Sequence, residues 1–224
     1  HHWEEHCRLL FANSDEPLAV SLATQIVGAE DAAGPDRSFD STRKRVLTLL
    51  FMKHGDKTWP IIGAALLRED SFRISGLLSA DTLHTGLGPD QLAESFSSPF
   101  WALDSSVVIP WFREHPEVVE TIFRSVALFV TNPDHSLGWH PLILAMLREF
   151  FQPAHGSEIG ANLWSFGSTG SRVPYIQRRI RLLESLLKET KPALRAFGRT
   201  WIEHLKSDLA DEKKEDQQRQ AGIW

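Results

Sequence analysis

Residues Val173–Leu205, VPYIQRRIRLLESLLKETKPALRAFGRTWIEHL, decide the fold that we expect for this chain. Apolar side chains recur there at helical spacing in two stripes: Ile176, Ile180, Leu183 and Leu187, then Leu194, Phe197, Trp201 and Leu205. Proline is tolerated in the first turn of a helix and disrupts its interior, so Pro192 ends one helix and begins the next. The stretch therefore predicts a helical hairpin. A hairpin cannot bury both stripes alone, so it must pack on neighbouring helices.

The composition is that of a globular protein and excludes several classes. The 224 residues are 42% hydrophobic and 24% charged, which is ordinary. A single cysteine, Cys7, leaves no disulfide framework and is compatible with a reducing cytosol. With no run of eighteen apolar residues and no signal segment, we expect a cytoplasmic protein that does not associate with membranes. The net charge of -5 disfavours a dedicated nucleic-acid binder but allows a local basic ridge.

The start of the sequence has the pattern of a helix already under way. The first residue is not Met, and Trp3, Cys7, Leu10 and Phe11 recur at helical spacing. We therefore expect the chain to be part of a longer polypeptide, with further domains outside it.

The helical patterns divide the chain into four parts. Residues 1–70 are expected to form N-terminal helical hairpins. Residues 71–100 are rich in glycine and predict an irregular joint, with a short helix at Asp90–Phe96. Residues 101–206 are expected to form a C-terminal helical repeat region, and residues 207–224 a charged helix extension or tail.

Four of the expected helices open on a proline that is followed by an apolar face, at Pro60, Pro116, Pro141 and Pro192. Their spacing corresponds to one helix per about 25 residues, or one helical pair per about 50, close to the period of HEAT and armadillo repeats. The fold class predicted is all-α: a right-handed HEAT-like or armadillo-like solenoid of about ten helices, built from stacked helical hairpins.

The ends of two of these helices can be predicted from single residues. A helix carrying Val46 and Phe51 is expected to end at Gly55, and the next to begin at Trp59-Pro60, which makes a hairpin. The helix that begins at Pro116 is expected to run to about Val130.

The strings Val173–Leu183 and Lys191–Phe197, followed by the charged helix around Trp201, resemble the end of degenerate HEAT-like α-solenoids. Such solenoids lie at the C-termini of large bacterial proteins, including STAND/NACHT-type NTPases and other anti-phage defence proteins. The resemblance covers roughly residues 115–220 and depends on helix packing. It implies a non-catalytic module that recognises a phage trigger or joins sister protomers, without a cofactor, while an NTPase or effector elsewhere does the work.

The basic residues of this region supply a candidate surface and the alternative function. They are Arg172, Arg178, Arg179, Arg181, Arg195 and Arg199. Arg178 and Arg181, like Arg195 and Arg199, are spaced to share a helix face. Such a ridge can track phosphates, so a nucleic-acid-binding solenoid is the alternative. Interleaved glutamates, among them Glu184 and Glu203, favour mutual ion pairing on a solvated face instead.

Tryptophan is the other unusual feature, with eight residues against one tyrosine. Trp111 and Trp164 lie outside clear apolar stripes, and exposed tryptophan suits a protein interface, although core packing is the default. The candidate interaction surface is therefore made of Arg172, Arg178, Arg181, Arg195, Arg199, Trp111 and Trp164.

No constellation in the sequence predicts a catalytic centre, and we expect this region not to be an enzyme. Residues 167–172, GSTGSR, lack the lysine and the preceding strand of a phosphate-binding loop and favour a linker. Asp104-Ser105-Ser106 precedes an apolar run and predicts a helix N-terminus rather than part of a hydrolytic set.

Histidines give a third hypothesis, a helical enzyme with a bound metal. His115 and His140 each precede a proline, and stacked helices can bring them together, with His135 as a further ligand. No carboxylate or cysteine stands at ligand spacing from either, so N-cap or packing roles are favoured. We expect neither a metal nor a cofactor.

Overall fold

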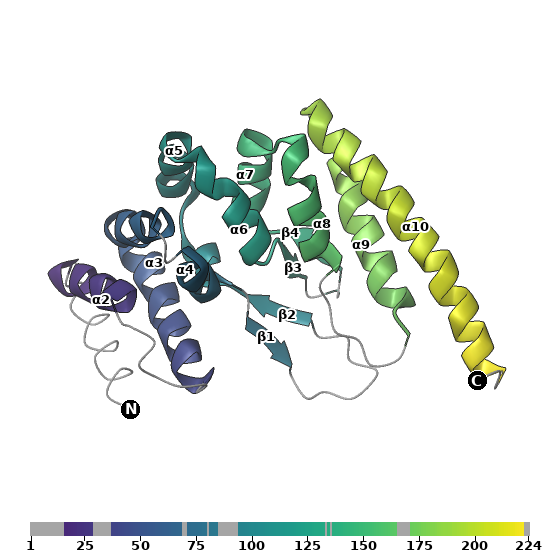
Figure 1. Cartoon of the computed structure of the whole chain (residues 1–224), viewed down its shortest axis with the longest axis horizontal. Helices are drawn as coiled ribbons and strands as arrows, with labels where there is room; N and C mark the ends of the chain where they lie inside the picture. The colour runs from purple at the N-terminus through teal and green to yellow at the C-terminus, as the bar shows by residue number, and fades with distance from the viewer. Residues whose placement is uncertain are drawn as a thin grey trace. The chain divides into compact units, whose positions relative to one another are not determined.

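The computed structural model describes residues 16–28, 37–68, 71–79, 81–84, 94–132, 134, 136–164 and 171–221. These residues are mostly helical, as the sequence predicts, and contain nine α-helices (Figure 1). They also contain four short strands in two pairs, β1–β2 and β3–β4, which an all-α fold does not include. The chain divides into two compact units: residues 1–82 with 97–127 (unit 1), and residues 83–96 with 128–224 (unit 2).

Unit 1 is helical and contains α2 (Glu16–Gly28), α3 (Arg37–Leu66), α4 (Ser71–Leu78), α5 (Ser105–Glu114), α6 (Val119–Ser125) and the 3-10 helices η1 (Pro99–Ala102) and η2 (Pro116–Val118). Its core is aromatic. Trp59 of α3 is fully buried, and its ring centroid lies 5.5 Å from that of Phe100 and 5.8 Å from that of Phe112. These three rings join α3, η1 and α5; the Trp59–Phe100 pair is edge-on, an arrangement that stabilises a core beyond its buried area.

The helix α3 contains both of the helices expected around Gly55, but they meet at His54 without the predicted loop. The backbone of His54 is non-helical, with φ −135° and ψ 33°. Its carbonyl accepts a hydrogen bond of 2.8 Å from the Thr58 hydroxyl, and side-chain hydrogen bonds of this kind often accompany a bend in a helix. Pro60 therefore lies inside the second half of a kinked helix rather than at the start of a separate one.

The segment 71–100, expected to be an irregular joint, contains the helix α4. Two expectations about single elements are wrong. The described part of the helix expected at Asp90–Phe96 is the strand β2 (Glu94–Ser97), which is paired with β1 (Asp81–His84). The helix after Pro116 ends at Ser125 instead of about Val130. Residues 129–131 are aromatic or β-branched, and strand pairing overrides the helical pattern there.

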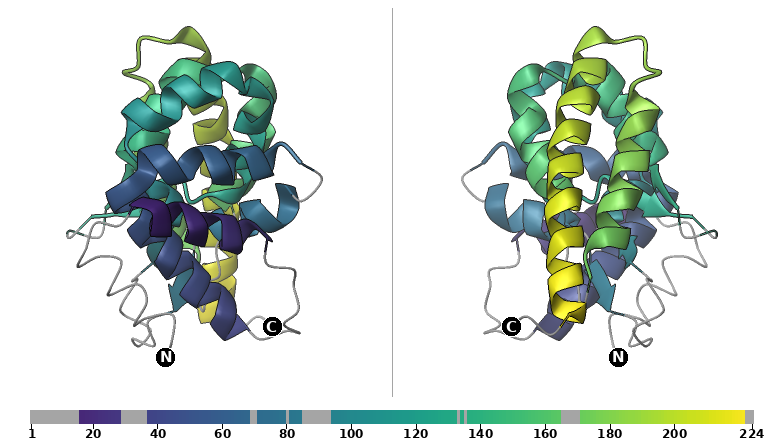
Figure 2. Two further views of the ribbon diagram at one scale, coloured as in Figure 1. Left: turned by 90° about the vertical axis from the view of Figure 1, so that its left-hand side faces the viewer. Right: turned by 90° about the vertical axis from the view of Figure 1, so that its right-hand side faces the viewer.

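Unit 2 contains β3 (Phe129–Thr131), β4 (Leu137–Trp139), α7 (Pro141–Phe150), η3 (Pro153–His155), α8 (Gly156–Trp164), α9 (Val173–Leu186) and α10 (Pro192–Gln220). The strands β3 and β4 are antiparallel, with Phe129 opposite Trp139. The helices α9 and α10 lie side by side along their lengths (Figures 1 and 2). The hairpin and its break at Pro192 are confirmed, and the helical extension beyond residue 206 reaches Gln220.

Glycines bring the helices of unit 2 into close contact. A β carbon at Gly160 of α8 would lie 1.7 Å from Cζ2 of Trp201 on α10. A β carbon at Gly198 of α10 would lie 3.3 Å from the carbonyl oxygen of Leu183 on α9. Because neither glycine carries a side chain, α8 and α9 can both pack tightly on α10. None of the described helices is both long enough and apolar enough to cross a membrane.

Candidate interaction surface

The seven residues predicted from the sequence do not all belong to one unit. Trp111 lies on α5 in unit 1, whereas Trp164 and the five arginines lie on or beside α8, α9 and α10 in unit 2.

Trp111 is a packing residue of unit 1. Its ring centroid lies 5.3 Å from that of Trp59, 5.1 Å from that of Phe112 and 4.5 Å from that of His115. A β carbon at Gly63 of α3 would lie 2.7 Å from the indole of Trp111. The side chain is half-buried by these contacts, which join α5 to the second half of α3.

Arg178 is buried in unit 2, together with its neighbour Arg179. Arg178 is 5% exposed, and its guanidinium lies 5.1 Å from the ring centroid of Tyr175. Arg179 is fully buried; its Nε donates a hydrogen bond to the carbonyl of Leu163 on α8, and its guanidinium lies 5.2 Å from the ring centroid of Phe129. Hydrogen bonds and aromatic faces offset part of the cost of burying such charges.

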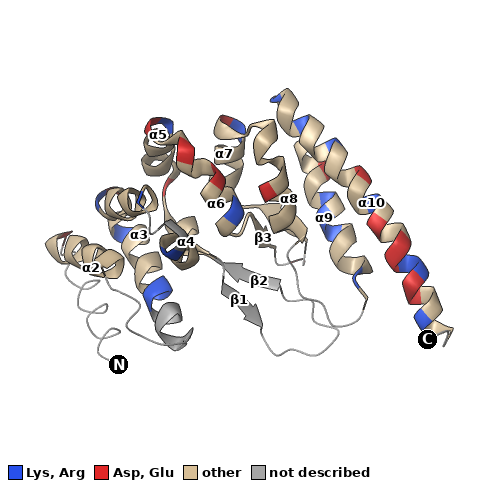
Figure 3. Ribbon diagram, in the orientation of Figure 1, with Lys and Arg blue, Asp and Glu red and all other residues tan. Residues whose placement is uncertain are grey.

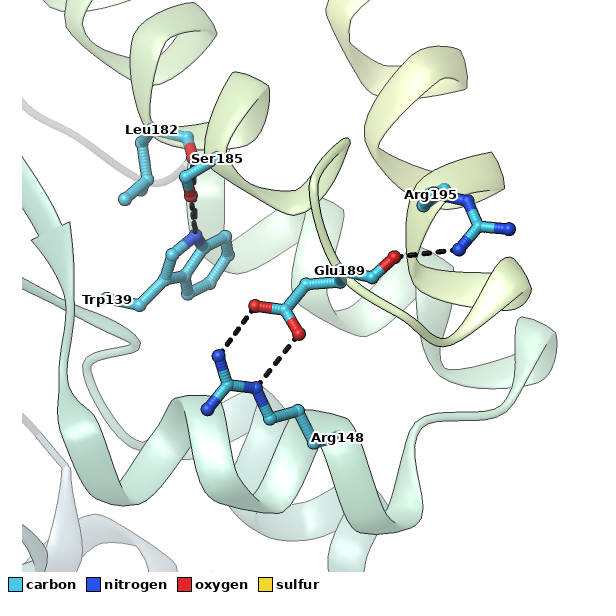
Figure 4. A network of polar contacts seen from close by, with 6 residues as sticks. All are labelled: Trp139, Arg148, Leu182, Ser185, Glu189 and Arg195. Atoms are coloured by element: carbon cyan, nitrogen blue, oxygen red, sulfur yellow. Dashed lines mark hydrogen bonds and ion pairs between the residues drawn. The ribbon is translucent and has the colours of Figure 1, made fainter.

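Arg195 and Arg172 lie near helix ends. One guanidinium nitrogen of Arg195 donates to the carbonyl of Glu189 (Figure 4) and to that of Thr190, both at 2.7 Å, and so binds carbonyls that follow α9. The guanidinium of Arg172, before the start of α9, lies 4.8 Å from the ring centroid of Trp164 at the end of α8. The structure thus brings Arg172 and Trp164 together.

Arg181 and Arg199 are the predicted arginines that remain exposed to solvent. Because Arg178 is buried while Arg181 is exposed, the two do not form one accessible ridge. Figure 3 shows acidic and basic residues mixed along α10 rather than a single-sign surface. Glu203, for example, pairs with Lys206 at 3.0 Å.

A polar network at the turn between α9 and α10 was missed by sequence reasoning (Figure 4). Arg148 of α7 binds Glu189 through two hydrogen bonds, of 2.9 and 2.8 Å, and this pairing holds the pKa of Glu189 below its ordinary value. Lys191 donates to the carbonyls of Arg148 and Glu149, and its burial lowers its pKa. The network joins the end of α7 to the turn, and no spacing in the sequence indicates a pairing over so many residues.

Trp139 of β4 forms a second connection to α9. Its indole N–H lies 3.1 Å from the Ser185 hydroxyl and 3.3 Å from the Leu182 carbonyl (Figure 4). The ring is 9% exposed, so these contacts supply a hydrogen-bond partner for a buried donor. These polar contacts are structural: the Arg148–Glu189 pair holds α7 to the turn after α9, and the Trp139 indole holds β4 to α9.

The residues considered for chemistry have other roles where the structure describes them. Asp104 is the N-cap of α5 and accepts a 2.7 Å hydrogen bond from the Ser106 N–H, which confirms the predicted helix N-terminus. Hydrogen bonds from Ser106 also lower the pKa of the Asp104 carboxyl. Residues 165–170, which include most of the glycine- and serine-rich loop, lie outside the described residues.

The histidines considered as metal ligands do not come together in the described part of the chain. His115 belongs to unit 1, where its Nδ1 lies 3.7 Å from a carboxylate oxygen of Glu117. His140 belongs to unit 2, and burial lowers its pKa to about 4. His135 lies outside the described residues. Within the described part of the chain, no group of three or more His, Cys, Asp or Glu residues is arranged to hold a metal ion.

No protein-family model, curated protein or solved structure matches this chain. What the described residues define is a mostly helical protein of two compact units.

Proposed function

We propose that the chain is a HEAT-like helical repeat region that acts as a non-catalytic scaffold or recognition module, mediating protein–protein interaction within a larger bacterial defence protein. The observation that carries the proposal is the α8–α9–α10 packing of unit 2. There, glycines at 160 and 198 let α8 and α9 both lie directly against α10, and close helix packing of this kind is what stacked helical pairs require. Repeat proteins of this kind bind partners through the surfaces that stacking creates.

The roles of the polar residues in unit 2 support the same proposal. Arg148, Glu189, Lys191 and Arg195 bind one another or backbone carbonyls at a helix junction. Arg178 and Arg179 lie in the interior. These groups are used to fix the arrangement of helices, which is the task of a scaffold. The partner is a protein, either a phage trigger or sister protomers, and the setting is the bacterial cytoplasm.

Two measurements on the whole chain test this function. Sedimentation velocity over a range of concentrations detects self-association. A pull-down from bacteria expressing phage proteins detects a trigger, and each captured candidate is then purified and titrated directly against the chain. We expect either self-association or saturable binding of one phage protein. A chain that is monomeric throughout and binds none of the captured candidates directly contradicts the proposal.

The alternative is a nucleic-acid-binding solenoid. The exposure of Arg181 and Arg199 favours it, whereas the burial of Arg178 and the helix-end role of Arg195 remove two members of the ridge. Phosphate contacts release counterions, so such binding weakens steeply with salt. A titration of duplex DNA and duplex RNA at low and physiological salt separates the two functions. Tight, strongly salt-dependent binding that is lost in Arg181→Glu supports the alternative, and no binding at low salt dismisses it.

A further inference from the structure

The inner face of α10 changes in chemistry along its length. In its first half the residues buried in unit 2 are apolar: Leu194, Phe197, Ile202 and Leu205. Beyond Leu205, the buried side chain is Glu212, which is 6% exposed. The second half of this helix, Asp208–Gln220, is here called the arm. Its one apolar side chain that is even partly buried is Leu209, which is half-buried, so its fully buried contact with the rest of unit 2 is polar, in contrast to the first half.

These polar contacts join the arm to the residues that open α9. Glu212 accepts a 3.2 Å hydrogen bond from the backbone N–H of Arg172, and Asp216 accepts one from the Ser171 hydroxyl. Arg219 lies 2.8 Å from Glu212 and 3.2 Å from Asp216, so it binds both acceptors from within the arm. Hydrogen bonding to Glu212 raises the pKa of Arg219, which therefore stays charged.

Such contacts can be broken at lower cost than apolar packing. When the arm separates, Glu212 and Asp216 regain water and keep Arg219 as a local partner, because all three belong to the same helix. Separation of the first half would expose Phe197 and Leu205 to water, which is unfavourable in proportion to the apolar area. Segments with few buried apolar contacts open at lower free energy than the rest of a domain.

We propose that the arm is a strap that opens as a unit, while residues 192–205 of α10 remain packed on α8 and α9. Opening uncovers Ser171 and the backbone N–H of Arg172 at the start of α9. An isolated helix of this length is marginal in water, so an open arm also frays. The strap is a conformational device that controls access to the start of α9, and it does not depend on the function proposed above.

Hydrogen exchange followed by mass spectrometry on the whole chain tests this proposal. The double variant Glu212→Gln, Asp216→Asn keeps the shape of both side chains and removes their charges. We expect amides of residues 208–220 to exchange about tenfold faster than in the wild type, as loss of charged hydrogen bonds predicts, while residues 194–205 are unchanged. The control Asp211→Asn removes one negative charge at an exposed position of the arm, where no contact with α9 is lost, and is expected to have no effect.

A milder variant guards against the case in which the double variant unfolds. Ser171→Ala removes the hydroxyl that donates to Asp216 and accepts a 3.2 Å hydrogen bond from the Val173 N–H at the start of α9. Because it leaves Glu212 and Asp216 charged, it is expected to speed exchange in the arm by a smaller factor, with an unchanged circular dichroism spectrum. Acceleration that is uniform along α10 overturns the proposal. The proposal is also overturned if neither Ser171→Ala nor the double variant changes exchange in the arm. It is overturned as well if Asp211→Asn accelerates exchange there as much as the double variant does.

Discussion

Gly160 of α8 and Trp201 of α10 are so close that a β carbon on residue 160 would lie 1.7 Å from Cζ2 of the indole and 2.1 Å from Cη2. Both atoms belong to the benzene half of the indole, which therefore lies directly over the glycine. Gly160 is buried and Trp201 is half-buried. The contact sets how closely α8 and α10 approach within unit 2.

The variant Gly160→Ala is expected to lower the free energy of unfolding by about 2 kcal/mol, because the added methyl group forces the indole or the helix to move. The gain in helix propensity, at most about 1 kcal/mol, does not compensate for this. Urea unfolding followed by circular dichroism measures the change. The control is Gly76→Ala in α4, where nothing lies within 4 Å of the added carbon, and this variant is expected to be neutral or slightly stabilising.

A double variant identifies the cause of that loss. Trp201→Leu removes the ring atoms that a β carbon at residue 160 would meet, so Gly160→Ala should cost much less in the Trp201→Leu background than in the wild type. An interaction energy near zero in this cycle would show that Gly160 is required for a reason other than the indole.

Trp111 is expected to act in stability rather than in recognition. Trp111→Ala removes ring contacts with Trp59, Phe112 and His115 and should lower the free energy of unfolding by about 3 kcal/mol. Met52→Ala, at a side chain that is 67% exposed, is the control and should change stability by less than about 0.5 kcal/mol. A stable Trp111→Ala variant that fails to bind a confirmed partner would instead assign Trp111 to an interface.

Glu189 should contribute a pH-dependent part of the stability of unit 2. Its pKa is held below the ordinary value of 4.5 by the hydrogen bonds from Arg148. The stabilisation by the Arg148–Glu189 pair is therefore complete when the pH is above the ordinary pKa of 4.5. It is lost as the pH falls through the lower pKa that Glu189 has in the folded state. Glu189→Gln should cost about 1 kcal/mol at neutral pH and less in acid.

The matched control for this prediction is Glu203→Gln, which removes an exposed pair with Lys206. It is expected to have little effect at any pH, because exposed pairs of this kind contribute little. Urea unfolding of both variants from neutral to acidic pH makes the comparison. Equal costs for the two variants would contradict the role given to the Arg148–Glu189 pair.

His140 should make the protein less stable in mild acid. Its pKa is lowered from 6.5 to about 4 by burial, so the folded state binds a proton less readily than the unfolded state. The stability is therefore fully present above pH 6.5 and is lost progressively as the pH falls toward about 4. Between about pH 7.5 and about pH 5, the wild type should lose more stability than His140→Gln, as urea unfolding would measure. Identical slopes for the two proteins would refute this assignment.

The sequence predicted the helical class and several boundaries correctly because those depend on local chemistry. Pro192 fixes the start of α10, Asp104 caps α5, and the charged segment after residue 206 is helical to Gln220. The helical pattern was insufficient where strand pairing or a kink in the backbone decided the local structure. Phe129–Thr131 form β3 by pairing with β4, and the break in α3 falls at His54 rather than at the glycine that follows it.

For the candidate surface, the sequence showed which arginines share the helices α9 and α10 but not which of them are exposed. Helical spacing shows which side chains share a face, and it does not show how many neighbours surround the helix. Because α9 contacts α10, β4 and α8, its buried face is wide enough to include Arg178 and Arg179. The sequence by itself thus determined a proline-bounded helical hairpin. Only the tertiary structure decided which charges lie inside it, because burial depends on contacts between residues far apart in the chain.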